Sequence, residues 1–538
     1  MKKLFFFIFI SFFFVKLYAQ TGTYLYDFRF YKQIDSNLYS PKSRVHTSIK
    51  PFQLDDSILL AAFDSIVDPS IDISRDRSWL MRKLLYEHLI EIREKDFNVN
   101  IDFLPDFQIG RDFLQNKTTW LNTRGFQIQG NIGKKFSFYT SAYENQGVFP
   151  GYLTQFINEN QIIPGIVNDK TASNQPPADK KDWAWASAIL NYTPNKYFSF
   201  TLGQDKNFIG DGYRSMLLSD VSANYPFFKI VTTLGNVKYV NIWAQFNEIP
   251  VPRPEFDINF KRKWGAFHYL DWNVNNRLSV GFFESIIWAD NDPIYGTKRG
   301  FDVSYLNPLI FYRTIEGSNG SPDNALIGFN GKYKLAGNFT FYGQFILDEF
   351  TAGEFFSNKG YWGNKYGLQT GFRVTDAFKI RNLGFLAEFN TAKPYTYSSA
   401  YSISNYGNYR QSLAHPFGAN FRELLSVWNY SFKRWGFYLQ GNYANYGLDP
   451  SELNNYGKDI FKSYDTREAG YGNSTGQGLK TNFFYLDSRF SLLLNPKSNL
   501  RLELGGVYRK ETNSLTSDRT TWVTFGLRSS FRNIYQDF

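Results

Sequence analysis

The segment Phe339-Thr340-Phe341-Tyr342-Gly343-Gln344-Phe345-Ile346-Leu347-Asp348 alternates apolar and polar residues along most of its length. A period of two indicates a β-strand with two different faces. The same alternation recurs at 126–132, 500–504 and 523–528. A soluble antiparallel sheet can show this pattern. Charges on one face, an apolar opposite face and an apparent export signal together favour a membrane barrel with a wet lumen.

The first residues are typical of a secretory signal peptide. Two lysines precede an apolar run from Leu4 to Val15, and Ala19 is a small residue at a suitable cleavage position. The run is too short to cross a bilayer, which needs about twenty residues. We therefore expect residues 1–19 to be a signal peptide, with an uncleaved membrane anchor as the alternative.

The last seven residues also indicate the compartment. Tyr535 and Phe538 reproduce the aromatic spacing that ends the last strand of bacterial outer-membrane barrels. Together with the export signal, this ending predicts an outer membrane of the Gram-negative type, with lipid as a partner and long loops at the cell surface. We expect the last strand to run from Trp522 to Phe531.

Composition narrows the function classes. The 55 Phe, 37 Tyr and 12 Trp residues make 19% of the chain, as expected if aromatic girdles ring both membrane interfaces. The absence of cysteine excludes disulfides and thiolate nucleophiles, and four histidines argue against a histidine-rich metal site. We expect no metal and no cofactor. A net charge of +10 fits anionic lipid or an acidic polysaccharide and is too weak to indicate nucleic acid.

Residues 20–97 read as an extended segment followed by a small periplasmic helical element. Helical spacing of apolar residues predicts one helix over 55–67 and a second over 74–97. The stripe of the second helix is expected to dock against the barrel, with a partner-binding helix as the alternative. The stripe consists of Leu80, Leu84, Leu85, Leu89 and Ile92.

Residues 98–538 are predicted to form the barrel. Eight tight turns are expected at Lys134, Asn195, Asn236, Asn276, Gly337, Ala377, Lys433 and Asn495. Eight hairpins, one strand before them and one after them predict an all-β, antiparallel transmembrane barrel of about 18 strands. Long segments lie between the turns, at 147–182, 206–225, 247–263, 289–325, 349–364, 392–420 and 446–481. These segments are expected outside the cell, and function is expected there.

This part of the chain contains several distinctive sequence motifs. They are Gly203-Gln204-Asp205-Lys206-Asn207-Phe208-Ile209-Gly210-Asp211-Gly212-Tyr213-Arg214-Ser215, Phe301-Asp302-Val303-Ser304-Tyr305-Leu306-Asn307-Pro308, Phe311-Tyr312-Arg313, Pro322-Asp323-Asn324-Ala325, Tyr342-Gly343-Gln344, Leu347-Asp348-Glu349-Phe350, Trp362-Gly363-Asn364-Lys365-Tyr366-Gly367 and His415-Pro416-Phe417-Gly418-Ala419-Asn420-Phe421. In this order they resemble the capsule-assembly Wzi-like outer-membrane proteins, and most of all the branch of the gliding motility protein RemB.

The resemblance covers most of residues 98–440, and the later part matches only as barrel strands. Lys393 departs from the family pattern, which has Arg before the proline, so no role that needs a bidentate Arg is carried over. The resemblance implies a barrel of about eighteen strands with an N-terminal helical element at its periplasmic end. It also implies a role with surface polysaccharide and, for this branch, in surface motility.

The polar motif residues have two interpretations. The simpler one is a lumen network that fixes folded-in loops by hydrogen bonds, and the other is direct ligand contact. The residues are Tyr213, Arg214, Asn307, Arg313, Asp323, Asn324, Gln344, Asp348, Asn364, His415 and Asn420. Asp348 should face the lumen and pair with Arg214 or Arg313. His415 has no Ser or Asp partner visible in sequence, so no nucleophilic triad and no enzyme are expected.

Two loops carry residues suited to sugars, which stack on aromatic rings and bond to polar groups. The candidate polysaccharide contacts are Tyr395, Tyr397, Tyr401, Tyr406, Tyr409, Lys458, Lys462 and Arg467. The alternative is that these tyrosine-rich loops pack on one another. We predict a non-enzymatic barrel that binds or organises capsule or slime and supports adhesion or gliding. A subunit of a larger outer-membrane secretion or assembly complex, with motility or secretion proteins as partners, and a substrate-specific porin are the alternatives.

Overall fold

The computed structural model describes residues 25–53, 57–67, 77–166, 169–171, 179–250, 260–309, 311–312, 323–335, 338–357, 359–529 and 532–538. The predicted signal peptide at 1–19 lies outside the described residues, and so does Arg313. Among the helices of the described part, none is long and apolar enough to cross a membrane.

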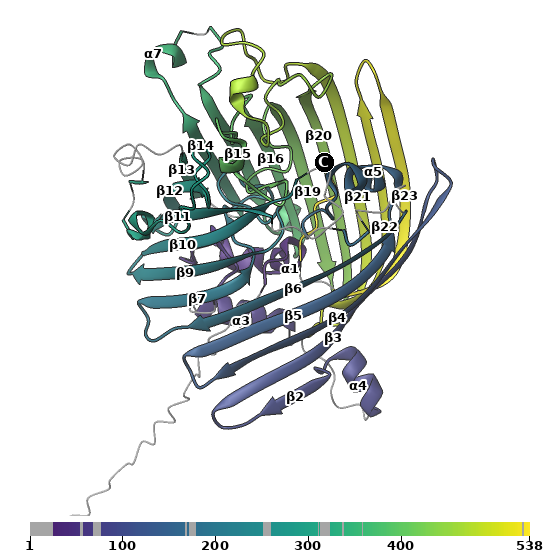
Figure 1. Cartoon of the computed structure of the whole chain (residues 1–538). Coiled ribbons are helices and arrows are strands. Elements are labelled where there is room, and N and C mark those ends of the chain that lie inside the picture. The colour runs from purple at the N-terminus through teal and green to yellow at the C-terminus, as the bar shows by residue number, and fades with distance from the viewer. Residues whose placement is uncertain are drawn as a thin grey trace, which may run out of the picture.

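Eighteen antiparallel strands of the described chain close into one barrel (Figure 1). In chain order they are β3 (Phe97–Asp112), β4 (Lys117–Ile132), β5 (Phe136–Val148), β6 (Lys180–Tyr192), β7 (Phe198–Asp205), β9 (Tyr225–Leu234), β10 (Val237–Glu248), β11 (Lys261–Asn273), β12 (Leu278–Ala289), β13 (Asn324–Lys334), β14 (Phe339–Glu349), β15 (Lys365–Val374), β16 (Leu383–Ala392), β19 (Phe421–Phe432), β20 (Trp435–Leu448), β21 (Leu479–Asn495), β22 (Leu500–Thr512) and β23 (Ser517–Ser529). Pairing of β23 with β3 closes the ring.

The strand count and the turn positions confirm the reading of the alternating pattern. Seven of the eight expected turn residues lie in or beside the short connection between two consecutive strands, and Gly337 lies outside the described residues. The long connections stand at the other end of the barrel. Short turns face the periplasm and long loops face outward in outer-membrane barrels, which orients this one.

The two faces of the wall have opposite character. On β14, Thr340 and Gln344 are buried inside, whereas Phe341 is 46% exposed on the outside. The wall is apolar outside and polar inside, the reverse of a water-soluble protein, and a barrel in lipid requires this arrangement. The predicted fold class and the outer-membrane location are therefore confirmed.

Shorter elements lie inside and around the barrel. The helices are α1 (Phe28–Tyr31), α2 (Asp35–Leu38), α3 (Ser57–Val67), α4 (Trp79–Leu85), α5 (Gly151–Asn160) and α7 (Ala352–Phe355), with 3₁₀ turns η1 (Lys32–Ile34), η2 (Val303–Leu306), η3 (Ala377–Lys379), η4 (Ser402–Ser404) and η5 (Tyr464–Thr466). The short strands are β1 (Ile49–Lys50), β2 (Ile90–Arg93), β8 (Phe208–Ile209), β17 (Gly407–Asn408) and β18 (Gln411–Ser412).

The predicted helix over 74–97 is wrong. Only α4 is helical in the described part of that range, and β2 follows it. The reason is tertiary: β2 pairs antiparallel with the start of β3, Ile90 opposite Ile101. The apolar stripe does not dock either, since Leu80 is 65% exposed. The first expected helix is confirmed as α3.

The last strand is confirmed as β23, which begins at Ser517, five residues before the expected start. Its expected end at Phe531 lies outside the described residues, and residues 532–538 turn into the lumen, where Figure 1 places the C-terminus. We call residues 532–538 the tail. Tyr535 and Asp537 are 4% and 2% exposed, because they find buried polar partners inside the barrel. The terminal aromatic residues thus belong to the filling of the barrel and not to its wall.

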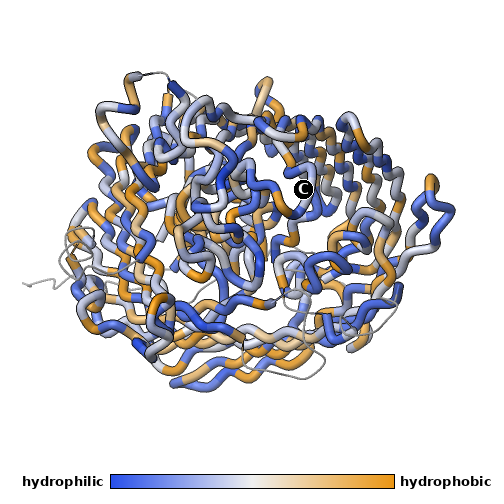
Figure 2. The backbone as a smooth tube through the Cα atoms, turned by 45° about the horizontal axis from the view of Figure 1, so that its top comes forward, coloured by the Kyte–Doolittle hydropathy of each residue, from blue (hydrophilic) through white to orange (hydrophobic). Residues whose placement is uncertain are grey.

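Four segments fill the lumen and form what we call the plug: residues 25–53, 206–224, 393–420 and 532–538. Figure 2 shows the tube crossing the interior of the ring of strands. Within the plug, β1 of the N-terminal segment pairs with β8 of the second segment, Ile49 opposite Ile209. The barrel therefore has a packed interior over much of its cross-section.

Candidate functional site

Arg214 is the centre of an ion network inside the plug. Its side chain is fully buried, and Nη2 lies 2.9 Å from Glu423 Oε1 and 2.6 Å from Asp537 Oδ2. His415 Nε2 lies 2.8 Å from the other oxygen of Glu423. Three segments far apart in sequence thus meet through one guanidinium. A buried charge of this kind needs such partners because desolvation is costly.

Asp348 is not paired with Arg214, and the other expected partner, Arg313, lies outside the described residues. It faces the lumen and is 1% exposed, but its side chain lies 3.3 Å from Lys365 Nζ and accepts a 2.7 Å bond from the backbone N–H of Tyr397. The predicted pairing with Arg214 is wrong because Glu423 and Asp537 occupy that guanidinium.

The other motif residues hold loops to the wall where they are buried. Gln344 accepts from Met216 N at 2.8 Å and donates to Ile209 O at 2.9 Å. Asn420 donates to Gln477 O at 3.0 Å. Asn324 donates to Ser404 O, and Asp323 is paired with Arg299. The Tyr213 ring packs against Phe28 and Tyr535. Asn364 is half-buried and Asn307 is exposed.

Three of the candidate tyrosines are not at the surface. Tyr395, Tyr397 and Tyr406 are at most 1% exposed, and their hydroxyls donate to backbone carbonyls at 2.8, 2.8 and 2.6 Å. Direct stacking of a surface sugar on these rings is therefore ruled out in this conformation. They pack inside the loops, which was the alternative reading, whereas Tyr401 and Tyr409 stay partly exposed.

A cleft of about 390 Å³ opens between four outer connections and the tail, and we call it the outer cleft. It has aromatic, amide, cationic and acidic groups on its walls. The residues used below are Asn160, Arg410, Gln411, Lys458, Phe461 and Phe538. Phe156 of α5 contacts Phe538 with ring centroids 4.4 Å apart, so the end of the tail forms part of this cleft.

Arg410 stands at the tip of the β17–β18 hairpin. Tyr409 and Arg410 both have left-handed backbones, with φ of 48° and 54°. Such turns normally favour Gly or Asn, and strained non-glycine positions often mark functional sites. Asn247 fixes the tip, since its carbonyl accepts a 2.7 Å bond from Tyr409 N and its amide donates to the Tyr409 hydroxyl.

The Arg410 guanidinium lies 5.3 Å from the ring centroid of Phe461. Among the described residues it forms no ion pair, and its Nε is buried without a hydrogen-bond partner. A cation stacked on a ring and lacking a carboxylate partner is available to an acidic ligand. Sequence reasoning missed Arg410, because nothing local distinguishes it from other loop arginines.

The three predicted basic residues separate in the structure. Lys458 lines the outer cleft, with Nζ 4.9 Å from the Tyr446 ring centroid, and burial lowers its pKa from the usual value. Lys462 is paired with Asp449 at 2.7 Å. Arg467 stacks 4.2 Å from the ring centroid of Trp362. Lys458 is thus the member of this set that reaches the cleft.

Aromatic rings also gather at the rim of the outer loops. Trp362 lies 4.8 Å from Tyr464, and Tyr361 lies 5.4 Å from Tyr471. The first ring of each pair comes from the β14–β15 loop and the second from the β20–β21 loop. The motif around Trp362 was visible in the sequence, but its partners in the other loop were not.

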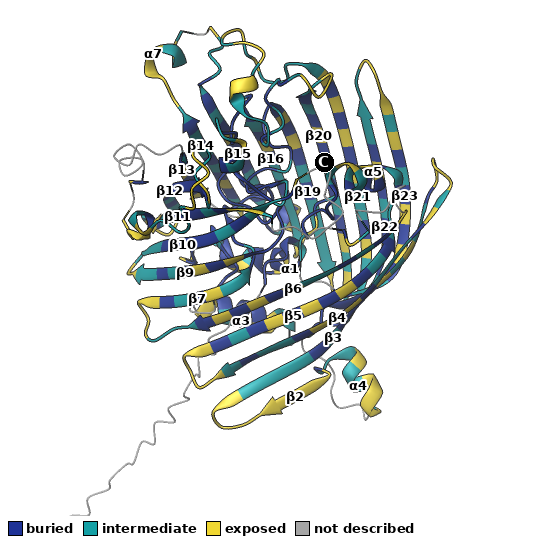
Figure 3. Ribbon diagram, in the orientation of Figure 1, coloured by how far each residue is buried: buried dark blue, intermediate teal, exposed yellow. Residues whose placement is uncertain are grey.

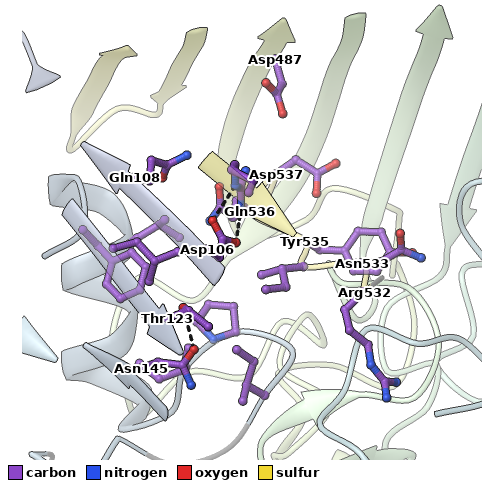
Figure 4. Close-up of a pocket in the computed structure, with 18 of the residues that line it drawn as sticks. Asp106, Gln108, Thr123, Asn145, Asp487, Arg532, Asn533, Tyr535, Gln536 and Asp537 are labelled. Carbon is purple, nitrogen blue, oxygen red and sulfur yellow. Dashed lines mark hydrogen bonds and ion pairs between the residues drawn. The ribbon is translucent and has the colours of Figure 1, made fainter. Parts of the chain in front are cut away.

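A second cavity of about 180 Å³ lies in the lumen below the tail. Figure 4 shows Asp106, Gln108, Thr123 and Asn145 of the wall around the tail residues Arg532 to Asp537. Trp183 also lines it, and its indole N–H has no hydrogen-bond partner among the described residues. The space holds on the order of ten waters. Tyr535 lines both cavities, so the tail separates them.

One solved structure with a TM-score above 0.5 shares this architecture. No family model matches the chain, and no curated protein matches it. Among solved structures, Wzi, described as a carbohydrate-binding β-barrel involved in group 1 capsule assembly in Escherichia coli, has a TM-score of 0.54 at 13% identity, over 94% of this chain and 98% of that one. OprD of Pseudomonas aeruginosa gives 0.41 at 7%, over 80% and 94%, and OccAB2 of Acinetobacter baumannii gives 0.43 at 10%, over 80% and 97%. The chain is an outer-membrane β-barrel with a Wzi-like fold.

Proposed function

We propose that this barrel binds acidic cell-surface polysaccharide in the outer cleft and catalyses no reaction there. The observation that carries the proposal is Arg410, a guanidinium on a strained hairpin that lacks a carboxylate partner among the described residues. A sugar carboxylate would pair with this cation. The amides of Asn160 and Gln411 would bond its hydroxyls, and Phe461 or Phe538 would meet its apolar face.

Binding fits the packed interior better than bulk transport does. The four plug segments place buried side chains across the lumen, whereas a diffusion channel needs a continuous wet path. The likeness to Wzi, described as carbohydrate-binding, supports the same direction. The motif resemblance to the RemB branch extends the proposal to holding capsule or slime during adhesion or gliding.

The test is binding of the purified protein in detergent to polysaccharide from its own cell surface, at low and high salt. Saturable binding that weakens with salt is expected, because screening reduces attraction between exposed charges. Arg410→Gln should lower the affinity about ten- to a hundredfold, since a hydrogen bond to a charged group contributes about 1.5–3 kcal/mol.

The matched control is Arg381→Gln. Arg381 is an exposed arginine in the periplasmic turn between β15 and β16, so its loss changes net charge equally without touching the cleft. Equal affinity of wild type and Arg410→Gln would refute the site. No binding by the wild type at either salt would refute the function and favour a subunit of a larger complex, detectable by stable co-purifying proteins.

A further inference from the structure

A row of apolar side chains faces outward at the periplasmic end of the barrel wall. We call it the rim patch, and it consists of Trp79, Leu80, Met81, Leu84, Leu89, Ile90 and Ile92. Each of these side chains is between 37% and 65% exposed. Figure 3 shows α4 and β2 largely in the exposed colour, next to β3. Contiguous exposed apolar surface of this kind indicates an interaction surface.

The rim patch continues the lipid-facing side of the wall. Asp102 of β3 points inward, where it bonds His88 and Gln127. Because strand side chains alternate, Val99 and Ile101 point outward with the exposed Ile109 further along β3. β2 places Ile90 opposite Ile101 and Ile92 opposite Val99. The apolar side of β2 is therefore an extension of the surface that meets lipid.

The short helix α4 buries none of its apolar side chains. Leu80 and Leu84 are 65% and 39% exposed, while Arg82 and Lys83 pair with Glu87 at 3.0 and 2.9 Å. A surface helix normally turns its apolar side to the protein and its charges to water. Water on the outer side of α4 would leave this arrangement unfavourable.

Hydrogen bonds prevent the helix from rolling over to hide its apolar side. Asn495, at the end of β21, donates 2.7 and 2.9 Å bonds to the carbonyls of Lys83 and Glu87. Arg434 of the neighbouring turn donates to Leu85 O at 3.3 Å. The C-terminal end of α4 is thus tied to the periplasmic turns of the wall, and these bonds set the orientation of the helix on the barrel.

We propose that α4 and β2 lie in the interfacial zone of the periplasmic leaflet and bind phospholipid as an anchor outside the barrel wall. Leu80, Met81 and Leu84 enter the acyl boundary, and Trp79 takes the interfacial position that its amphipathic ring favours. The helical element is then part of the membrane contact and not a periplasmic domain that hangs free below it.

The cysteine-free sequence allows a direct test with single labels. Leu80→Cys carries a nitroxide in protein reconstituted into vesicles of phosphatidylethanolamine and phosphatidylglycerol. Relaxation by oxygen, which concentrates in lipid, is compared with relaxation by a water-soluble nickel chelate. Leu202→Cys on the lipid face of β7 and Leu453→Cys in an outer loop, 62% and 95% exposed, give the lipid and water references.

The oxygen-to-nickel ratio at position 80 should be closer to the Leu202 reference than to the Leu453 reference, and several-fold above the latter. A ratio closer to the Leu453 reference would overturn the proposal and leave the rim patch as a surface for a periplasmic protein. Heat-modifiable mobility of each labelled variant in gels verifies that the barrel is folded. Because Leu80 is exposed, the label replaces no packed side chain.

Discussion

Replacing Arg214 with Met should release the tail from the lumen while the barrel stays closed. Asp537 of the tail is 2% exposed and receives a 2.6 Å bond from Arg214. Met has a similar length but carries no charge and no donor. Asp537 and Glu423 would then face each other without the cation between them. The wall has no such dependence, because backbone ladders join β23 to β22 and to β3.

The magnitude follows from the burial of all three groups. Breaking a buried ion pair by removing one partner costs about 3–5 kcal/mol, since the remaining charge is left uncompensated. Each 1.4 kcal/mol is a factor of about ten in an equilibrium constant. The equilibrium for tail release should therefore rise about a hundred- to several-thousandfold. Arg214→Lys should fall between, since an ammonium cannot bridge two carboxylates as a planar fork does.

Carboxypeptidase digestion of the protein in vesicles measures release of the tail, and intact mass after fixed times reports the loss of residues from Phe538 inward. Single-channel conductance in planar bilayers provides a second readout, because the tail separates the lumen cavity from the outer cleft. Arg381→Met, in the exposed periplasmic turn, is the matched control. A folded Arg214→Met variant with wild-type digestion rate would show that other anchors hold the tail and that the ion network is dispensable.

Three further outcomes are expected. Glu503→Gln, which removes the carboxylate that four buried or half-buried arginines share, should lower unfolding stability in urea and detergent by about 3–5 kcal/mol; an unchanged midpoint would contradict this. Gly457→Ala, at φ 81°, should destabilise the β20–β21 loop by about 1–2 kcal/mol of backbone strain, which protease digestion would detect as faster cleavage of the loop. Gly470→Ala, with open space around it, should leave the cleavage rate unchanged. Deleting residues 532–538 should preserve the heat-modifiable barrel, and failure to fold would restore a role for the tail in the last strand.

The wall was predictable because its strands share the same alternation of apolar and polar residues. Lipid on one side and a wet lumen on the other impose a period of two, and a turn such as the one at Lys134 interrupts it visibly. Strand number and the side of the long loops follow from that pattern alone. The second predicted helix failed at Ile90, where pairing with Ile101 of β3 outweighed the helical spacing.

The plug and the candidate site depend on contacts that have no local signal. Asp537 meets Arg214 across 323 positions of sequence, and the spacing of Tyr535 and Phe538 is the same in a wall strand and in an inserted tail. Tyrosines in a loop have one composition whether they are exposed or buried, and Tyr397 is buried because its hydroxyl reaches Met216 O. Arg410 becomes distinctive only once its hairpin conformation is known.

The antiparallel pairing of β1 with β8 has a mechanical consequence. Gly210 N donates to Ser48 O at 2.8 Å, and Lys50 Nζ donates to Gly210 O at 2.6 Å, so a segment that enters from outside is joined to one that enters from the periplasm. A polymer pulling on the outer loops would load this joint along the central axis as well as the wall. Tension at the cell surface would then reach the N-terminal segment directly, through the pairing of β1 with β8 inside the barrel.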